Sequence, residues 1–333
     1  MKTVMSSPDD VLEAARLIRA GEVVAFPTET VYGLGANAWD ANACQKIFQA
    51  KGRPADNPLI VHVSGLNGLS RVVAGKVSEP VRQLLLAYWP GPLTLVLPAD
   101  AHVPSVVRGG LETVAVRAPS HPVAQALIAA CRCPIAAPSA NLSGRPSPTQ
   151  ARDVFEDLNG RIPLILDDGP TQWGLESTVL DVTVTPPVLL RPGAIALEQL
   201  ESYLGTVIRA SADAPVRAPG MKYRHYAPSV PVWWWKTESV DEIDKKWSSL
   251  DNQASYALLA SHAIGDAIRP SLFYNLGDTD QEVAHRLFYG LRLLDRRKPR
   301  TIIVSWVPKT PLGEAIANRL GKASGDPDDG RIS

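Results

Sequence analysis

The stretch Pro27-Thr28-Glu29-Thr30-Val31-Tyr32-Gly33-Leu34-Gly35 follows a run from Glu22 to Phe26 that its apolar pattern predicts to be a β-strand. A proline opens the stretch, glycines close it, and threonine and tyrosine hydroxyls stand between them. The sequence therefore predicts a hydroxyl-rich turn after that strand. Short hydroxyl groups held in fixed positions suit a small polar molecule such as a zwitterion, so we expect this turn to border a binding site.

A basic cluster, Lys51-Gly52-Arg53, follows a predicted helix from about Asp40 to Ala50. Arginine offers a planar fork to two oxygens and lysine a mobile point charge, and phosphate oxygens require charge-assisted donors of this kind. The alternative is a solvated basic loop, because cations are favoured at the C-terminus of any helix. The pair is a candidate for holding a polyanion, together with Asn57 on the turn that follows.

A second cluster, Ser139-Ala140-Asn141, follows a predicted short strand from Ile135 to Ala137. Alternate residues of an extended segment point the same way, so Ser139 and Asn141 can both face a bound nucleotide. The alternative is an Asx or Ser turn, which composition alone favours. Ser147, which lies between two prolines, is a further candidate for contact with phosphate.

Other candidate residues lie within or at the ends of predicted strands. His62 is inside a strand of buried type, where a lone histidine is usually a satisfied core residue. Arg117 ends a valine-rich strand, and a guanidinium at that depth requires an anionic partner, which a substrate carboxylate can supply. The remaining candidates are polar groups at the start of one strand and a cation at the end of another: Glu176, Ser177, Thr178 and Arg191.

The composition is that of an ordinary soluble protein. With 333 residues the chain is long enough for about two domains, and 34 basic against 34 acidic residues leave no net charge that would recruit nucleic acid or a membrane. Three cysteines without C-x-x-C spacing favour a reducing compartment and small buried thiols over a disulfide scaffold or a zinc site. No signal-peptide pattern and no run of about 18 apolar residues occurs. We therefore expect a cytoplasmic protein with no membrane span and no structural metal.

The alternation of strands and helices predicts the domain organisation. Over residues 1–205 it is irregular, which predicts an α/β domain with a twisted mixed sheet. Over 230–324 it predicts a smaller, Rossmann-like α/β/α domain. No G-x-G-x-x-G motif follows a strand there, so a second dinucleotide site is not expected. A linker over 206–229 and a tail over 325–333 complete the prediction.

The predicted linker contains Pro219-Gly220-Met221-Lys222-Tyr223-Arg224-His225-Tyr226-Ala227-Pro228. A passive spacer has little use for tyrosines, a histidine and cations packed so closely, which favours a functional segment. The alternative is a surface loop that packs its aromatic side chains locally.

The K-G-R, S-A-N and P-T-E-T-V-Y-G-L-G stretches resemble the threonylcarbamoyl-AMP synthase family, whose catalytic part is the YrdC-like domain. The similarity covers residues 8 to about 205, and the P-G-M-K-Y-R-H-Y-A-P stretch and the region after it resemble the two-domain form of the family. The resemblance implies a nucleotidyltransferase that converts L-threonine, bicarbonate or CO2, and ATP into L-threonylcarbamoyl-adenylate and pyrophosphate, with Mg2+ accompanying ATP. It also implies that the product passes to a tRNA threonylcarbamoyl-transferase complex for the threonylcarbamoyladenosine modification of ANN-decoding tRNAs, and it leaves direct tRNA binding open.

The resemblance also implies roles for matched residues. We further hypothesise that the segment 219–228 folds over the pocket as a lid, with Tyr226 touching the nucleotide. Trp173 and Asp168 depart from the family pattern at the pocket edge. The implied catalytic signature residues are Lys51, Arg53, Ser139 and Asn141; those that line the L-threonine pocket are Thr30, His62, Arg117, Ala137 and Ser177; those that contact ATP are Arg53, Asn57, Thr113, Ser139, Ser147, Arg191 and Tyr226.

Two other functions stay open. A carbamoyltransferase of the hydrogenase-maturation type shares the YrdC-like domain, but the zinc-finger and acylphosphatase-like segments expected of it are missing from this sequence. An RNA-binding module is the other alternative, because cations cluster near the end of one predicted helix, although such a cluster is more typical of a solvated face. The cluster consists of Arg292, Arg296, Arg297, Lys298 and Arg300.

Overall fold

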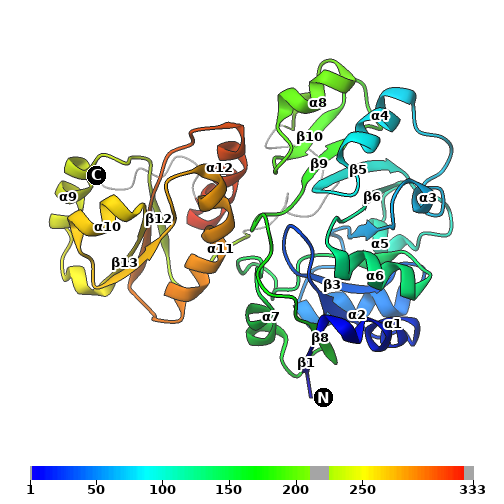
Figure 1. Ribbon diagram of the computed structural model, residues 1–333, viewed down its shortest axis with the longest axis horizontal. Helices are drawn as coiled ribbons and strands as arrows, with labels where there is room; N and C mark the ends of the chain where they lie inside the picture. Colours follow the sequence, from blue (N-terminus) through cyan, green and yellow to red (C-terminus); the bar gives the residue numbers. More distant parts are fainter. Residues whose placement is uncertain (1, 211–224, 326–333) are drawn as a thin grey trace. The chain divides into compact units, whose positions relative to one another are not determined.

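The computed structural model describes residues 2–210 and 225–325, which form two compact units (Figure 1). The second unit includes two short loops from the N-terminal part of the chain. Parts of the predicted linker and of the predicted tail, 211–224 and 326–333, lie outside the described residues. Of the described residues, the first unit contains 2–143, 148–172 and 176–210, and the second contains 144–147, 173–175 and 225–325.

An 11-stranded sheet organises the first unit, in the order β1-β8-β2-β3-β7-β4-β6-β5-β9-β10-β11. Parallel pairs such as β4 with β6 and antiparallel pairs such as β4 with β7 both occur, so the predicted mixed sheet is confirmed. The strands are β1 Val4–Ser6, β2 Val24–Phe26, β3 Gly33–Asn37, β4 Ile60–His62, β5 Leu93–Pro98, β6 Thr113–Arg117, β7 Ile135–Ala137, β8 Leu164–Leu166, β9 Thr178–Asp181, β10 Val188–Arg191 and β11 Ile208–Arg209.

Local chemistry sets the ends of the helix that precedes the basic cluster. α2 begins after Asp40, whose side chain accepts from the backbone N–H of Asn42 at 2.9 Å, and it ends at Gly52, which has a φ of 61°. Lys51 is therefore the last helical residue. The helices of this unit are α1 Val11–Arg19, α2 Ala41–Lys51, α3 Leu66–Leu69, α4 Glu79–Tyr88, α5 Ser105–Arg108, α6 Pro122–Cys131, α7 Ala151–Leu158 and α8 Leu197–Leu204.

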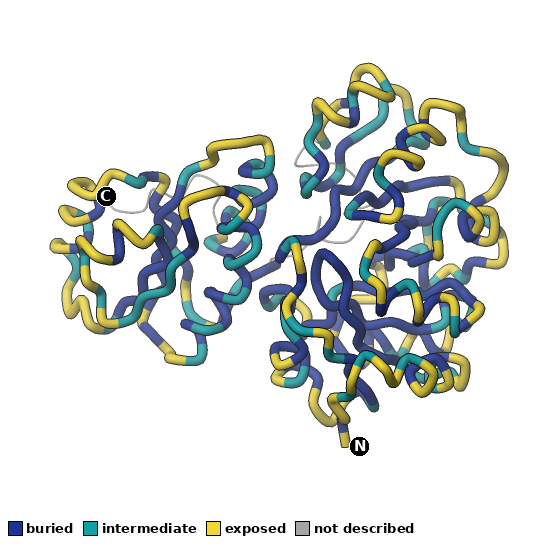
Figure 2. The backbone as a smooth tube through the Cα atoms, in the orientation of Figure 1, coloured by how far each residue is buried: buried dark blue, intermediate teal, exposed yellow. Residues whose placement is uncertain are grey.

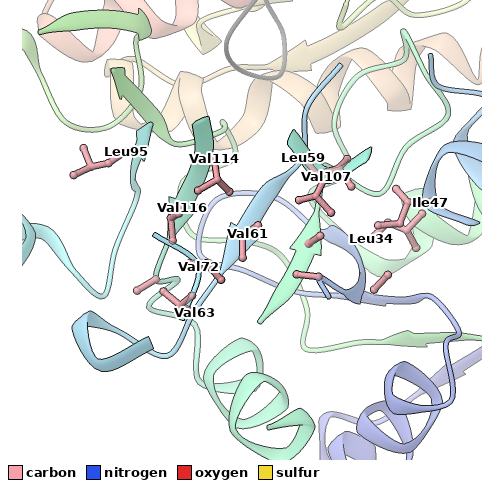
Figure 3. Packing of buried hydrophobic residues seen from close by; sticks show 14 of the residues in the cluster. Leu34, Ile47, Leu59, Val61, Val63, Val72, Leu95, Val107, Val114 and Val116 are labelled. Atoms are coloured by element: carbon pink, nitrogen blue, oxygen red, sulfur yellow. The ribbon is translucent and has the colours of Figure 1, made fainter. Parts of the chain in front are cut away.

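Most strands of this sheet are buried along their length (Figure 2), and alternate residues of a strand belong to clusters on opposite faces. Figure 3 shows the packed side chains of the main cluster. Val61, Leu95 and Val116 belong to the main cluster on one face. On the other face, α1 and α6 pack over the end of the sheet that carries β8, β2 and β7. Further along that second face lies a small apolar cluster of Ile60, Val96, Ala115 and Val179.

The second unit contains a parallel four-stranded sheet in the order β12-β15-β13-β14. Helices α9 and α10 cover one face and α11 and α12 the other, as the Rossmann-like alternation predicts (Figure 1). A capping box starts α11, because Thr279 and Glu282 exchange hydrogen bonds there. The elements are β12 Val232–Trp235, α9 Val240–Ser248, β13 Tyr256–Ala260, α10 His262–Ile268, β14 Leu272–Asn275, α11 Asp280–Asp295, β15 Thr301–Ser305 and α12 Pro311–Ser324.

The predicted turn 27–35 is wrong in its last part. Gly33–Asn37 forms β3, which pairs with both β2 and β7 and makes the sheet continuous. The sequence pattern hides this strand because glycine is rare in strands. Here Gly35 is required by close packing, since a Cβ atom on it would lie 2.6 Å from Ile135 Cγ2. Helices α8 and α10 and strand β1 were not expected either.

Within the described ranges, every helix is too short or too polar to cross a membrane.

Candidate substrate-binding site

One row of residues crosses five strands of the first unit's sheet. In register, His62 of β4 lies opposite Arg117 of β6, which lies opposite Thr94 of β5. Thr94 pairs with Val179 of β9, and Val179 with Arg191 of β10. Residues level with each other across a sheet point to the same face, and this is the face that α1 and α6 cover at its other end. The sheet thus aligns two arginines and a histidine that are far apart in sequence.

Arg117 contacts the turn that precedes β3. Its Nη1 donates to Thr30 Oγ1 at 2.7 Å, and its Nη2 lies 2.7 Å from Glu29 Oε1. The charged side chains are only 5% and 3% exposed. Thr28 Oγ1 lies 2.9 Å from Thr30 Oγ1, so hydroxyls and the ion pair are contiguous. The sequence predicted an anionic partner for Arg117, and the partner in this structure is Glu29, which sequence reasoning did not single out.

His62 is buried beside Arg117 and is neutral at physiological pH. Burial and, next, the positive charge of Arg117 lower the pKa of His62 to about 3, against the opposing effect of the carbonyls of Ile60 and Ile135. Its Nδ1 lies 3.2 Å from the Ile60 carbonyl oxygen. The position of His62 therefore fits both interpretations, a satisfied core residue and a residue that lines the binding pocket.

Ser177 connects the row to Arg191. Its hydroxyl lies 2.8 Å from Thr94 Oγ1, and Arg191 donates from Nη2 to that hydroxyl at 3.1 Å and from Nε to the Ser177 carbonyl at 3.0 Å. Gly193 packs directly on this segment, because a Cβ atom there would lie 2.2 Å from Thr178 N. Thr94 was not a candidate from sequence, since a single threonine inside an apolar strand gives no signal of its own.

Lys51 holds the turn that carries Ser139 and Asn141. Its Nζ donates to the carbonyl oxygens of both residues at 2.6 Å, and the lysine is 2% exposed. The Ser139 hydroxyl in turn donates to Asn141 Oδ1. An isolated bridge between Gly33 and Ser139 places this turn next to the 27–35 stretch. The structure therefore brings the two sequence clusters together, and Lys51 is a buried cation rather than part of a solvated loop.

The remaining candidates of the first unit lie on β6, on the neighbouring β7 or in the loop before β4. Ala137 is level with Ile60, which is level with Ala115. Thr113 lies two residues beyond Ala115 on the same face of β6. Arg53 donates from Nη2 to the Pro58 carbonyl at 3.2 Å, just before β4, and Asn57 is buried beside it. Ala137, a predicted threonine contact, and Thr113, a predicted ATP contact, thus lie on the same face of one sheet.

Two predicted ATP contacts, Ser147 and Tyr226, belong to the second unit. Tyr226 is 4% exposed, has a φ of 66°, and stacks on Phe288 of α11 with ring centroids 5.2 Å apart. The guanidinium carbon of Arg319 lies 5.8 Å from the Tyr226 ring. Of the expected lid, residues 219–224 lie outside the described residues.

The prediction of a solvated basic face is wrong for Arg292. This residue is 3% exposed and donates from Nε to the Pro146 carbonyl at 3.1 Å. Its position on the inner side of α11 follows from helical spacing, since it lies four residues after buried Phe288 and three before buried Asp295. Arg297, Lys298 and Arg300 are exposed.

Asp168, which the sequence comparison placed at the pocket edge, has its carboxylate 3.6 Å from His121 Nε2. Within 2–210 and 225–325, no three His, Cys, Asp or Glu side chains are grouped as a metal site.

The family models match both halves of the chain. Residues 16–193 match the Sua5/YciO/YrdC model, described as telomere recombination, and residues 195–325 match the model of the threonylcarbamoyl-AMP synthase C-terminal domain. The chain belongs to the threonylcarbamoyl-AMP synthase family. The resemblance seen in the K-G-R, S-A-N and P-T-E-T-V-Y-G-L-G stretches is thereby confirmed.

Individual members of the threonylcarbamoyl-AMP synthase family are similar over nearly the full chain. The threonylcarbamoyl-AMP synthase of Pyrococcus abyssi is 48% identical over 322 residues, which cover 94% of this chain and 93% of that protein. That of Bacillus subtilis is 45% identical over 326 residues, covering 95% and 93%. The crystal structure of P. abyssi Sua5 complexed with L-threonine matches with a TM-score of 0.88 and 45% identity, covering 97% of each chain.

Proposed function

We propose that this chain synthesises L-threonylcarbamoyl-adenylate from L-threonine, bicarbonate or CO2, and ATP, releasing pyrophosphate, for the threonylcarbamoyladenosine modification of tRNA. Membership of the threonylcarbamoyl-AMP synthase family supports the reaction. The L-threonine bound to the related P. abyssi protein supports the amino-acid substrate.

A set of buried polar atoms carries the proposal within this structure. Oε2 of Glu29, Nε of Arg117 and Oδ1 of Asn57 are buried without a hydrogen-bond partner among the described residues. Nearly all buried polar atoms in folded proteins are paired, so such a group of exceptions calls for a partner from outside the chain. The substrate is that partner.

The ion pair of Glu29 and Arg117 matches a free amino acid in charge. L-threonine carries a carboxylate and an ammonium group at neutral pH, and the buried pair offers one charge of each sign 2.7 Å apart. Arg117 binds the carboxylate, and Glu29 accepts from the ammonium. The neutral ring of His62 adds no second positive charge beside Arg117. The hydroxyls of Thr30 and Ser177 surround the same position, with Ala137 close to the side-chain methyl group.

The chemistry needs the threonine nitrogen as a free amine. Once the ammonium has lost a proton, which Glu29 is placed to receive, the nitrogen attacks CO2 to form a carbamate and releases a second proton. A carbamate oxygen then attacks the α-phosphorus of ATP, the bond to the β-phosphate bridging oxygen breaks, and pyrophosphate leaves. The mixed anhydride is labile in water, so a covered site favours the reaction.

The ATP residues would supply fixed donors for the departing charge. Arg53 and Arg191 contact phosphate oxygens, with Asn57, Thr113, Ser139 and Ser147 as neutral donors, and Mg2+ enters as part of the ATP substrate. Lys51 acts through the turn it holds, because its Nζ already donates to the Ser139 and Asn141 carbonyls. Tyr226 is a further candidate contact of ATP. Tyr226→Ala then weakens ATP binding and shortens the lifetime of the intermediate; unchanged values of both would remove Tyr226 from the proposal.

Pyrophosphate release tests the reaction. Release should require threonine, bicarbonate and ATP together, so omitting each in turn should abolish it. Glu29→Gln should raise the KM for threonine about tenfold or more, because a hydrogen bond to a charged group contributes about 1.5–3 kcal/mol, and should leave the KM for ATP unchanged. Glu79→Gln, which alters an exposed carboxylate of α4, is the matched control. Release that persists without threonine would rule the proposal out.

Amino-acid selectivity gives a second test of the pocket. A site that bonds the threonine hydroxyl leaves polar groups unpaired when valine enters, which rejects valine by about 10⁴-fold or more. Loss of one methyl group costs only about 1–3 kcal/mol, so serine should be the main competitor. Equal pyrophosphate release with valine and threonine would contradict a hydroxyl-recognising pocket.

The transferase complex that consumes the product, and direct binding of tRNA, stay predictions. The RNA-binding alternative rested on five clustered cations, of which Arg292 is buried. Binding of tRNA without any ATP-dependent pyrophosphate release would favour that alternative.

A further inference from the structure

Two cysteines flank the turn between α6 and β7. Cys131 is the last residue of α6, Arg132 follows with a φ of 57°, and Cys133 leads into β7. The residues Cys131 and Cys133 are 2% and 6% exposed, and both are free thiols. The chain reverses at Arg132, and the two cysteines on either side of it belong to the same buried cluster.

Two arginines are fixed beside this pair. Arg19 donates to the carbonyl oxygen of Ala130 at 2.6 Å, and Arg71 donates to that of Arg132 at 3.1 Å. These carbonyls belong to the residues that immediately precede and follow Cys131. The neighbouring Cys131 thiol and the nearby guanidinium charges lower the pKa of the Cys133 thiol, while the neighbouring Cys133 and burial raise the pKa of the Cys131 thiol. The two guanidinium groups thus favour a thiolate at Cys133.

Cys133 is accessible to a small molecule although its exposed area is small. It lines a cavity of about 420 Å³ together with Ser64, Arg71 and Arg132. A cavity of that size admits a peroxide molecule, and its arginines can donate hydrogen bonds to the peroxide oxygens.

We propose that Cys131 and Cys133 form a dithiol modification site for peroxides, in which Cys133 is oxidised and Cys131 closes a disulfide with it. The site lies apart from the substrate residues in sequence, but it immediately precedes β7, which carries Ala137 and leads to Ser139.

The chemistry balances with hydrogen peroxide as the oxidant. The Cys133 thiolate attacks one peroxide oxygen, the O–O bond breaks, and a sulfenic acid and hydroxide form. The hydroxide takes the proton of the Cys131 thiol, whose sulfur then attacks Cys133 and expels the sulfenic oxygen as hydroxide. That hydroxide takes up the proton which Cys133 gave up on ionisation. In sum, two thiols and one hydrogen peroxide give one disulfide and two waters.

Cys44 is the internal comparison. It is buried, its S–H donates to the Asn37 carbonyl at 3.3 Å, and burial raises the pKa of its thiol to about 12. A thiol held in this state reacts slowly with peroxide.

The test is mass spectrometry of the full chain after graded exposure to hydrogen peroxide. We expect a loss of about 2 Da from formation of one disulfide, reversal by dithiothreitol, and a peptide map that joins Cys131 to Cys133. Cys44→Ser should behave as the parent protein does. Cys131→Ser should stop at a sulfenic acid on Cys133 that dimedone traps, and Cys133→Ser should give no disulfide.

The rates provide an independent readout. Cys133 should react about tenfold faster than Cys44 or more, measured by site-resolved labelling of the parent protein, which requires no variant to fold. Reaction at Cys44 first, a disulfide between two chains, or an unchanged mass in excess peroxide would each overturn the proposal.

Discussion

The carboxylate of Glu29 and the guanidinium of Arg117 form the charged centre of the site. Removing one partner of a buried ion pair leaves the other charge uncompensated, which costs about 3–5 kcal/mol. Glu29→Gln should therefore lower the free energy of unfolding by about that amount in urea titrations, whereas Glu79→Gln at an exposed pair should change it by about 0–1 kcal/mol. The double variant Glu29→Gln/Arg117→Gln should lose less than the sum of the single changes. Strict additivity would show that the pair is not coupled.

The imidazole of His62 makes stability depend on pH. Its folded-state pKa is about 3, below the unfolded value of about 6.5, so the unfolded chain binds a proton in this range and the folded chain does not. Stability should thus fall as the pH drops from 6.5 toward 3, with a slope of up to about 1.4 kcal/mol per pH unit from this group. Urea unfolding of the parent and of His62→Gln at several pH values measures it. An identical slope in both proteins would contradict the assignment.

The ammonium group of Lys51 donates hydrogen bonds to the turn that carries Ser139 and Asn141. Replacing Lys51 should therefore affect stability and activity more than replacing a surface lysine does. Lys51→Met leaves the Ser139 and Asn141 carbonyls without this donor, which should lower the free energy of unfolding by about 1–3 kcal/mol and pyrophosphate release by about tenfold or more. Lys46→Met, on the same helix, breaks only a 41% and 39% exposed ion pair with Glu22 and should change stability by about 0–1 kcal/mol. Equal effects of the two changes would mean that the buried contacts of Lys51 do not matter.

At the scale of secondary-structure elements, strand β9 packs closely against the loop that follows β10. Gly193→Ala places a Cβ atom 2.2 Å from Thr178 N, so the backbone beside Ser177 must shift. We expect a loss of about 1–3 kcal/mol in stability and a higher KM for threonine. Gly205→Ala is the control, since that residue has a φ of 72° but open space around it, and it reports backbone strain alone. A KM for threonine that rises equally in both variants would contradict the packing argument.

The sequence predicted the bounds of helices and strands better than it predicted the contacts between side chains. The apolar strand β7 has its predicted bounds, and α2 lies within a residue of the helix predicted before the basic cluster. β3 was missed because its glycines serve packing against Phe26 and Ile135, which no local pattern reveals. The contact of Arg117 with Glu29 depends on strand order, and strand order is set by pairings across the whole sheet. Sequence motifs predicted the roles of the candidate residues, whereas only the structure shows that several of them lie in one row across the sheet.

At the scale of the whole molecule, two loops from the N-terminal part of the chain belong to the second unit. Arg292 of α11 donates to the Pro146 carbonyl, and Asp295 lies 3.5 Å from Arg145, so the loop 144–147 is anchored by α11. Arg292→Met should lower the midpoint of thermal unfolding by several degrees, because a buried carbonyl that loses its donor costs about 1–3 kcal/mol. Arg300→Met is the control, since its ion pair with Asp251 is exposed. A midpoint lowered as much by Arg300→Met would argue against the anchor.

Residues 144–147 and 173–175 belong to the second unit, so a single cut in the gene cannot separate the two units. A polypeptide that ends near residue 205 keeps the large sheet but forfeits the backbone that fits around Gly174, where a Cβ atom would lie 2.5 Å from the Ala284 carbonyl oxygen. Two fragments produced separately and mixed should, for the same reason, recognise each other through those loops. Complementation between the two fragments is what the shared loops imply.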